Sequence, residues 1–224
     1  QVRAETMLDL SCGSAAKIDS ALFLGAHCDD IEIGCGGTIQ KLVAARPDVK
    51  IHWVTLSSTP VREAETRRAA AMLLKGARQP DVRVASFANS FFPYSGAEIK
   101  AYFEGLKKDI NPDVVFTHYR HDLHQDHRVV NELTWNTYRN HLVLEYEIPK
   151  FDGDLGVPNA FSDLTRAQLD FKIDVLLECF ESERKKAWFT RSTFEAIARL
   201  RGIECNASEG FAEAFYIRKA ALHF

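Results

Sequence analysis

Two short clusters of histidine and aspartate residues have the composition of a hydrolytic metal site. The first, His-Cys-Asp-Asp at 27–30, directly follows the apolar run 21–25, and the second, His-Gln-Asp-His, lies at 124–127. Imidazoles and carboxylates bind borderline divalent cations, and three protein ligands leave the fourth tetrahedral position open for a water molecule. Together, the two clusters predict a zinc hydrolase site.

The first cluster contains two predicted ligands and one predicted base. His27 and Asp30 are three residues apart where a strand runs into a loop, so a backbone turn can direct both side chains at one ion. Asp29 then remains beside the metal as the candidate general base that takes a proton from the bound water. The alternative is that Asp29 and Asp30 cap the following helix or stabilise a turn, as Asp often does. The adjacent histidine and the second cluster favour catalysis.

The second cluster contributes the predicted third ligand, His127. His124 and His127 are three residues apart, so on the first turn of a helix they share a face, and His124 is expected to stabilise an oxyanion or to protonate a leaving amine. Asp126 is the expected outer partner that fixes a histidine tautomer and assists catalysis. An HxxH pattern alone is more often a helix start with its polar side chains in water. The joint occurrence of both clusters weakens that alternative.

Four further polar residues are expected near the site. Arg62 opens a predicted helix after the strand-like run 51–56, where it could bind a substrate hydroxyl or phosphate. An ion pair with a neighbouring glutamate on the helix surface is an equal alternative. His118, His121 and Asp122 precede the second cluster and are expected to line the same cleft, with His121 and Asp122 as substrate-binding residues.

The glycine-rich segment 34–38, Gly-Cys-Gly-Gly-Thr, has two interpretations. Glycines after a strand can expose backbone N–H groups to a phosphate at a helix N-terminus, but the spacing is neither the dinucleotide-binding nor the Walker pattern. We expect these glycines to allow close packing and sharp turns beside the metal. Cys28 and Cys35 are expected to be buried apolar side chains rather than ligands.

Strand-like and helical patterns alternate along much of the chain. The strand-like runs are 21–25, 51–56, 82–87 and 114–117. The helical patterns between them are 37–45, 62–75 and 97–110. This alternation predicts an α/β, Rossmann-like fold with a mostly parallel sheet and helices on both faces. Because ligands bind beyond the carboxyl ends of parallel strands, the two clusters, which both follow strands, are expected to meet there.

The remainder of the chain predicts further helices and strands. We expect a helix at 125–140, a strand at 142–148, a long loop at 149–161 that rims the site, helices at 164–183 and 193–201, and a strand or short helix at 211–217. We also expect an N-terminal extension over 1–19. A single domain then covers 20–224, with an elaboration of helices and strands from about residue 146.

Composition excludes several classes of protein. A length of 224 residues with 46% hydrophobic content allows one large domain with a substantial core. The net charge of -3 and the lack of a Lys/Arg stripe argue against a nucleic-acid partner. No apolar run approaches the ~18 residues that span a bilayer, so no membrane partner is expected. Five cysteines without CxxC spacing favour reduced thiols and a cytoplasmic location. Formation of a homo-oligomer is left open.

The motifs and their order resemble those of the PIG-L/LmbE-like zinc-dependent N-acetyl sugar deacetylases. The resemblance spans roughly residues 20–140 and rests on Ala-His-Cys-Asp-Asp-Ile-Glu at 26–32, the glycine-rich segment, Arg62-x-x-Glu65, and His-Gln-Asp-His-Arg at 124–128. The family's first motif usually reads Ala-His-Pro-Asp-Asp-Glu, so this chain departs at Cys28 and Ile31 and retains both ligands and the base. Arg62 matches a family position that looks substrate-binding.

The resemblance implies a Rossmann-like fold with one zinc ion per chain, held by His27, Asp30 and His127. It also implies that Asp29 is the base, that His124 assists at the oxyanion, and that the substrate is an N-acetylated sugar, such as N-acetylglucosamine, or a sugar conjugate. Acetate and a free amine are the implied products. Two alternatives stay open: another metal-dependent hydrolase that cleaves a phosphoester or a different amide, and a non-catalytic, nucleotide-binding Rossmann-like module.

Overall fold

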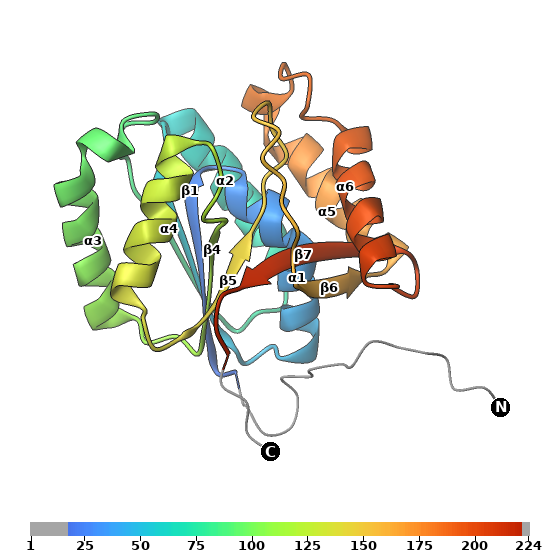
Figure 1. Ribbon diagram of the computed structural model, residues 1–224, viewed down its shortest axis with the longest axis horizontal. Helices are drawn as coiled ribbons and strands as arrows, with labels where there is room; N and C mark the ends of the chain where they lie inside the picture. Colours follow the sequence, from blue (N-terminus) through green and yellow to red (C-terminus); the bar gives the residue numbers. More distant parts are fainter. Residues whose placement is uncertain (1–17, 221–224) are drawn as a thin grey trace.

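A twisted seven-stranded sheet runs through the computed structural model, which describes residues 18–220 (Figure 1). The strand order is β3-β2-β1-β4-β5-β7-β6. The first five strands of this order are parallel, and β7 is antiparallel to both of its neighbours. The strands are β1 Ser20–His27, β2 Lys50–Ser57, β3 Gln79–Val84, β4 Val114–His118, β5 Leu142–Tyr146, β6 Ala160–Leu164 and β7 Phe211–Ile217. The predicted α/β fold with a mostly parallel sheet is confirmed.

Helices cover both faces of the sheet. They are α1 Asp30–Ala45, α2 Pro60–Leu73, α3 Gly96–Asp109, α4 Gln125–Thr137, α5 Arg166–Cys179 and α6 Arg191–Glu204, with short 3-10 turns at Phe92–Tyr94 and Glu181–Glu183. In Figure 1, α3 and α4 lie to the left of the sheet, and α5 and α6 lie to the right.

Alternation of side chains along β1 builds one apolar core on each face. Ala21 and Phe23 belong to the core that packs under α1, α2 and α5, and Leu22 and Leu24 belong to the core under α3 and α4. Successive residues of a strand point to opposite faces of a sheet. A central parallel strand is covered on both faces and is therefore apolar throughout, as β1 is.

The glycine-rich segment lies inside α1, so the expected start of this helix at residue 37 is wrong. A Cβ atom at Gly34 would lie 2.3 Å from Cδ2 of Tyr146, and one at Gly37 would lie 2.6 Å from Leu164. Glycine lets α1 approach β5 and β6 this closely, and the packing outweighs its low helix propensity. The expectation of close packing is confirmed, while these glycines form neither a sharp turn nor a phosphate loop.

The C-terminal part differs from the expected pattern in two places. The loop expected over 149–161 ends at β6, a strand that the sequence analysis missed. The helix expected over 164–183 is shorter, because Thr165 caps α5 through a reciprocal capping box with Gln168. The run 211–217 is a strand, β7, which completes the sheet between β5 and β6.

β3 begins three residues before the expected run 82–87 and includes Pro80. Because β3 lies at the edge of the sheet, it tolerates a proline there.

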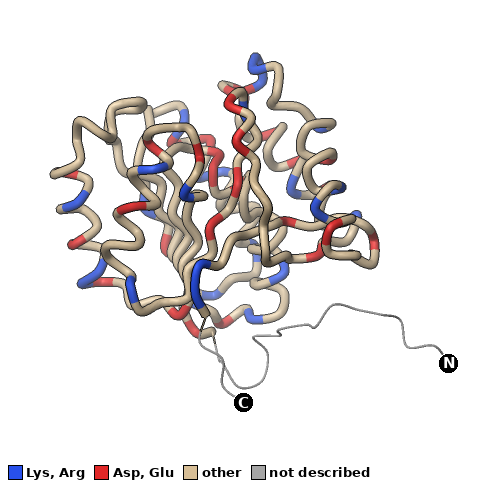
Figure 2. Tube along the Cα trace, in the orientation of Figure 1, with Lys and Arg blue, Asp and Glu red and all other residues tan. Residues whose placement is uncertain are grey.

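Residues 1–17 of the expected N-terminal extension lie outside the described part of the chain. Among residues 18–220, no helix is long and apolar enough to cross a membrane. Acidic and basic residues are interspersed along the described trace (Figure 2).

Candidate metal centre

The two clusters meet at the carboxyl ends of β1 and β4. These strands are neighbours in the sheet, and the strand order reverses between them. His27 is the last residue of β1, and the segment 119–124 connects β4 to α4. Parallel sheets form ligand sites at such reversals. The expected convergence of the two clusters is therefore observed.

A tight turn at Asp29 brings His27 and Asp30 together. Asp29 has φ 99° and ψ -26°, a left-handed conformation that costs a non-glycine residue about 1 kcal/mol. Its side chain makes no capping hydrogen bond, although it precedes α1. The backbone N–H of His27 donates to Asp30 Oδ2 at 2.6 Å. The helix-capping alternative for Asp29 is therefore wrong, whereas Asp30 does stabilise the turn, as the other half of that alternative expects. The strained turn points to a functional constraint.

The three predicted ligands present their donor atoms to one another. His27 Nδ1 lies 3.1 Å from His127 Nε2 and 3.5 Å from Asp30 Oδ2, and His127 Nε2 lies 3.5 Å from Asp30 Oδ1. Donor atoms on a tetrahedral zinc site with bonds of 2.0–2.1 Å are roughly 3.3 Å apart. The three side chains are buried. Their type and spacing fit a zinc ion.

The outer nitrogen of each ligand histidine binds a carboxylate. His27 Nε2 lies 3.0 Å from Asp126 Oδ2, and His127 Nδ1 lies 2.9 Å from Asp122 Oδ2. An N–H donated outward leaves the inner nitrogen with its lone pair directed at the cluster, the arrangement of metal-binding histidines. Asp126 therefore lies where an outer partner is expected. Buried Asp122 lies behind His127, a position that favours orienting His127 over the expected role in binding substrate.

The carboxylates around His27 favour a positive charge at the centre. Burial alone would lower the pKa of His27, but its hydrogen bonds with Asp126 and Asp30 raise that pKa to about 9. Burial alone would raise the pKa of Asp122, but the hydrogen bond from His127 holds that pKa well below its usual range. A bound cation supplies the same positive charge, so the electrostatics fit the donor set.

His118 lies at the site, as expected, although the sequence analysis assigned it no specific role. It is fully buried at the end of β4, and its ring stacks on His127 with centroids 3.9 Å apart. Its Nε2 accepts the backbone N–H of Ala26 at 2.9 Å and lies 3.2 Å from Asp30 Oδ2. Asp30, His118 and His127 form a second possible ligand group. Because Ala26 already uses the Nε2 lone pair, we favour His27 as the ligand.

Arg62 lies beside the predicted base. Its Nη2 is 3.1 Å from Asp29 Oδ1 and 3.2 Å from Glu183 Oε1, and it also donates to the carbonyl of Cys28. The alternative of an ion pair with a neighbouring surface glutamate is therefore wrong. Burial raises the pKa of Asp29 to about 8, although the nearby Arg62 opposes this shift. Glu183 is buried in the turn after α5, and no motif marks it in the sequence.

The spacing predicts that His124 and His127 share the first turn of a helix. In the structure His124 is instead the N-cap of α4, one residue before the helix begins. Its Nδ1 accepts the backbone N–H of Asp126 at 3.2 Å, so Nε2 carries the proton of the neutral ring and can donate. The ring meets His27 edge-on with centroids 4.8 Å apart. His121 is exposed and packs edge-on against Tyr119. His27, His124 and His127 form a further possible ligand group, whereas His121 belongs to none of these groups.

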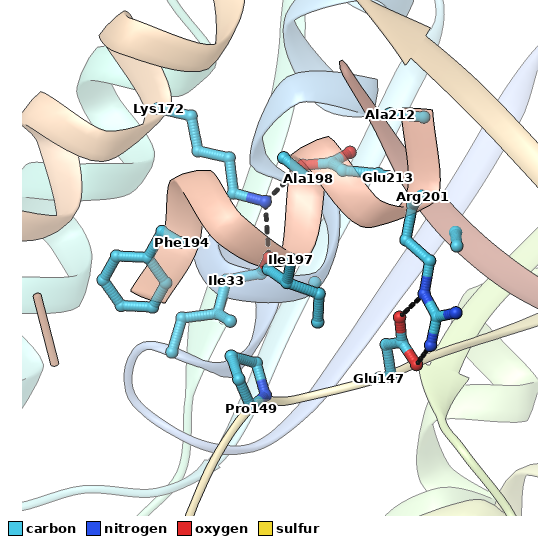
Figure 3. A pocket seen from close by; sticks show the side chains of 12 residues that line it. Ile33, Glu147, Pro149, Lys172, Phe194, Ile197, Ala198, Arg201, Ala212 and Glu213 are labelled. Atoms are coloured by element: carbon cyan, nitrogen blue, oxygen red, sulfur yellow. Dashed lines mark hydrogen bonds and ion pairs between the residues drawn. The ribbon is translucent and has the colours of Figure 1, made fainter. Parts of the chain in front are cut away.

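A buried ion pair holds α1 one turn after Asp30 (Figure 3). Lys172 Nζ donates at 2.6 Å to both Ile33 O and Glu213 Oε1. Glu213 also accepts the backbone N–H groups of Gly37 and Thr38, both at 2.7 Å. Ile33 O and Gly37 N are an i, i+4 pair of the helix ladder. The side chains of Lys172 and Glu213 therefore bind a carbonyl and an N–H group of the α1 backbone. This ion pair fixes α1 against α5 and β7.

The same ion pair lines a small cavity of about 30 Å³ between α1, α6 and β7. A second ion pair also lines it: Arg201 donates to both oxygens of Glu147, at 2.6 and 2.8 Å. None of the three predicted metal ligands lines this cavity. Each of the four charges already has an opposite partner, so we assign the cavity a supporting role beside the centre.

A family model described as PIG-L, GlcNAc-PI de-N-acetylase, matches residues 22–138, more than half of the chain. The matched segment runs from β1 to the end of α4 and contains both clusters. A search among curated protein sequences found no match.

Several solved structures share the fold. The N,N'-diacetylchitobiose deacetylase of Pyrococcus horikoshii has a TM-score of 0.66 and 20% identity, covering 90% of this chain and 84% of that protein. GalB, the 4-carboxy-2-hydroxymuconate hydratase of Pseudomonas putida, has a TM-score of 0.73 and 17% identity, covering 92% and 99%. The zinc-inhibited form of teicoplanin deacetylase Orf2 has a TM-score of 0.67 and 14% identity, covering 88% and 97%. At these identities the likeness establishes the fold, and the site residues must decide the chemistry.

Proposed function

The chain belongs to the PIG-L family, and from that premise we propose that it is a zinc-dependent N-deacetylase of a sugar or sugar conjugate. In this reaction water adds to the acetamido carbonyl carbon, the C–N bond breaks, and acetate and a free amine are released. The observation that carries the proposal is the meeting of three side chains, in which His27 Nδ1 and His127 Nε2 lie 3.1 Å apart and each lies 3.5 Å from one oxygen of Asp30, beside the buried carboxylate of Asp29.

We propose that one zinc ion per chain is held by His27 Nδ1, Asp30 and His127 Nε2. When bound, zinc supplies a Lewis acid that polarises the amide carbonyl and lowers the pKa of a water molecule. The chain contributes the orientation of its ligands, because Asp126 and Asp122 fix the outer nitrogens of the two histidines.

Asp29 has the position and charge environment of a general base. It follows His27 and Cys28 on the strained turn, and Arg62 at 3.1 Å favours its ionised form while burial favours its neutral form. A carboxylate balanced in this way can take the proton of the attacking water and later give it to the leaving amine. Arg62, which Glu183 also holds, keeps the Asp29 side chain in place.

His124 supplies a donor beside the two ligand histidines, with its ring centroid 4.8 Å from that of His27 and 4.6 Å from that of His127. Its Nδ1 accepts from the Asp126 backbone, so its protonated Nε2 can donate to the negative charge that develops on the carbonyl oxygen. This assignment needs only the neutral ring. Burial, followed by the nearby His27, lowers the pKa of His124 and so favours that neutral form.

Acetate release tests the proposal, because the same fold also occurs in a hydratase. The protein is stripped of metal with a chelator, reloaded with one equivalent of zinc, and assayed against a panel of N-acetylated sugars and conjugates. Zinc is not added in excess, since a zinc-inhibited form is known for teicoplanin deacetylase Orf2. We expect acetate and amine in equal amounts from the zinc-loaded protein and none from the stripped protein. Turnover that is equal with and without metal would refute the proposal.

A further inference from the structure

Glu213 on β7 is bound by four donors from α1 and α5. Its Oε1 accepts from the backbone N–H of Gly37 at 2.7 Å and from Lys172 Nζ at 2.6 Å. Its Oε2 accepts from the backbone N–H and the hydroxyl of Thr38, at 2.7 and 2.6 Å. The proposed mechanism uses neither Glu213 nor Lys172, although both are buried. A buried polar group with all its partners in place makes its surroundings rigid.

The glycine-rich segment 34–38 is the surface of α1 that receives this ion pair. A Cβ atom at Gly36 would lie 3.1 Å from Lys172 Cγ, and one at Gly37 would lie 3.2 Å from Glu213 Oε1. Side chains at these two positions would push the ion pair away from the helix backbone. The N–H groups of this segment therefore bind an anion, and that anion is a carboxylate of the chain itself.

Ile33 connects the ion pair to the metal centre. Lys172 Nζ donates at 2.6 Å to the carbonyl of Ile33 (Figure 3), and the N–H of Ile33 donates at 2.9 Å to the carbonyl of Asp29. Asp29 is the residue with the left-handed backbone, and Asp30 follows it. A strained residue keeps its conformation only where its surroundings fix it. Two successive hydrogen bonds thus join a buried lysine to the turn that carries the predicted base and a predicted ligand.

The other buried ion pair of the same cavity has no such connection. Arg201 and Glu147 bind each other, and Glu147 also accepts from the hydroxyl of Tyr216 at 3.1 Å. Arg201 binds Glu204 and the carbonyl of Gly156 as well. Within residues 18–220, neither member of this pair has a hydrogen bond or ion pair with α1. The two pairs share their burial and their cavity and differ in their contact with the helix that begins at the ligand.

We propose that Lys172 and Glu213 are positioning residues of the metal centre. They hold the first two turns of α1, so that Asp29 keeps its turn and Asp30 stays within reach of the two ligand histidines. This inference rests on the proposed zinc site. It adds two residues that lie outside the segment 22–138 that the family model matches.

The alternative is that Lys172 and Glu213 contribute stability alone. The two roles can be separated, because replacing both members of a buried ion pair by apolar side chains of similar size often leaves stability unchanged. The double variant Lys172→Met/Glu213→Leu therefore keeps the protein folded while it removes every contact of the pair with the α1 backbone. Arg201→Met/Glu147→Leu removes the second pair of the cavity and is the matched control.

Zinc affinity, measured by competition with a chromophoric chelator, is the first readout. We expect Lys172→Met/Glu213→Leu to bind zinc at least about tenfold more weakly than wild type, the lower end of the effect of residues that orient ligands. The control should keep the wild-type affinity. In the zinc-saturated enzyme, the first variant should lose about 10–100-fold in kcat with KM unchanged, since neither residue touches the substrate. Circular dichroism and urea denaturation show whether each variant is folded.

Wild-type zinc affinity in a folded Lys172→Met/Glu213→Leu protein overturns the inference, and so does an equal loss of affinity in both double variants. A loss in this variant alone supports it, whether or not acetate is released from any sugar. The affinity readout is thus independent of the deacetylase assay. A wild type that binds no zinc refutes the proposed function, and the inference with it.

Hydrogen exchange of the wild type decides the question if either double variant does not fold. Coupling between two sites is reciprocal, so zinc should slow exchange of the Ile33 and Gly37 amides more than that of the Ile99 and Phe103 amides in α3. Equal slowing in the two helices would contradict the inference.

Discussion

Asp126 Oδ2 lies 3.0 Å from Nε2 of His27, although the two residues are 99 positions apart in the sequence. The same carboxylate accepts two backbone N–H groups from the loop after β3. One side chain at the start of α4 therefore orients a ligand at the end of β1 and holds the loop that carries Phe91.

Asp126→Asn should weaken zinc binding. The amide keeps the shape of the side chain but removes the charge that orients His27 and raises its basicity, and loss of such a partner typically costs 10–100-fold in metal affinity. Competition with a chromophoric chelator measures the affinity. Asp163→Asn, at an exposed aspartate that pairs with Lys41, is the control. An unchanged zinc affinity in Asp126→Asn would contradict the assigned role.

Asp122→Asn distinguishes the two roles considered for Asp122. If Asp122 orients His127 through the 2.9 Å contact, the substitution lowers zinc affinity by a similar ~10–100-fold factor and leaves the KM of the zinc-saturated enzyme near the wild-type value. If Asp122 binds substrate, as the sequence suggested, KM rises and zinc affinity stays unchanged. Chelator competition and steady-state kinetics on the same preparation decide between them.

His118→Gln should retain one zinc ion per chain, while His127→Gln should lose it. His118 Nε2 already accepts the Ala26 N–H, whereas the inner nitrogen of His127 faces two other donor atoms. Metal analysis after gel filtration gives the zinc content of each variant, and circular dichroism checks that each one is folded. Loss of zinc from a folded His118→Gln protein would favour the group made of Asp30, His118 and His127 instead.

Glu213→Gln should lower the free energy of unfolding by about 3–5 kcal/mol, the usual effect of leaving one buried charge without its partner. The unpaired charge would be Lys172, which lies 2.6 Å from Glu213 and is also buried. Asp163→Asn removes half of the surface pair with Lys41 and should cost less than ~1 kcal/mol. Urea denaturation at equal zinc loading measures both. Equal effects of the two substitutions would show that the buried pair does not stabilise α1.

Sequence patterns predict most of the parallel sheet and the meeting of the two clusters, because strand order and the carboxyl ends of strands bring His27, Asp30 and His127 together whatever the details of packing. They do not predict Glu183, since a residue in a turn far along the chain carries no local signal of its contact with Arg62. Lys172 and Glu213 are missed for a related reason. A charged residue on an isolated helix or strand suggests a solvated face, and only the packing of α5 and β7 against α1 buries this pair.

Local helix propensity also does not predict that α1 starts at Asp30. Gly34 and Gly37 disfavour a helix by themselves, and contacts with Tyr146 and Leu164, both distant in sequence, make them suitable there. The displacement of His124 from the first turn to the N-cap has a local cause, because its ring accepts the N–H of Asp126. The HxxH spacing is compatible with either position.

Turnover by Asp29→Asn tests the central claim most directly. Asparagine has the same shape and tolerates the left-handed conformation at this position, so the turn and the zinc site should persist without a base. We predict that the zinc-loaded variant keeps one zinc ion per chain and loses about 10²–10⁴-fold in the kcat of acetate release. Asp48→Asn, at an exposed aspartate paired with Arg78, should match wild type. Near-normal turnover by Asp29→Asn with its zinc content intact would contradict a hydrolytic site in which Asp29 moves the proton.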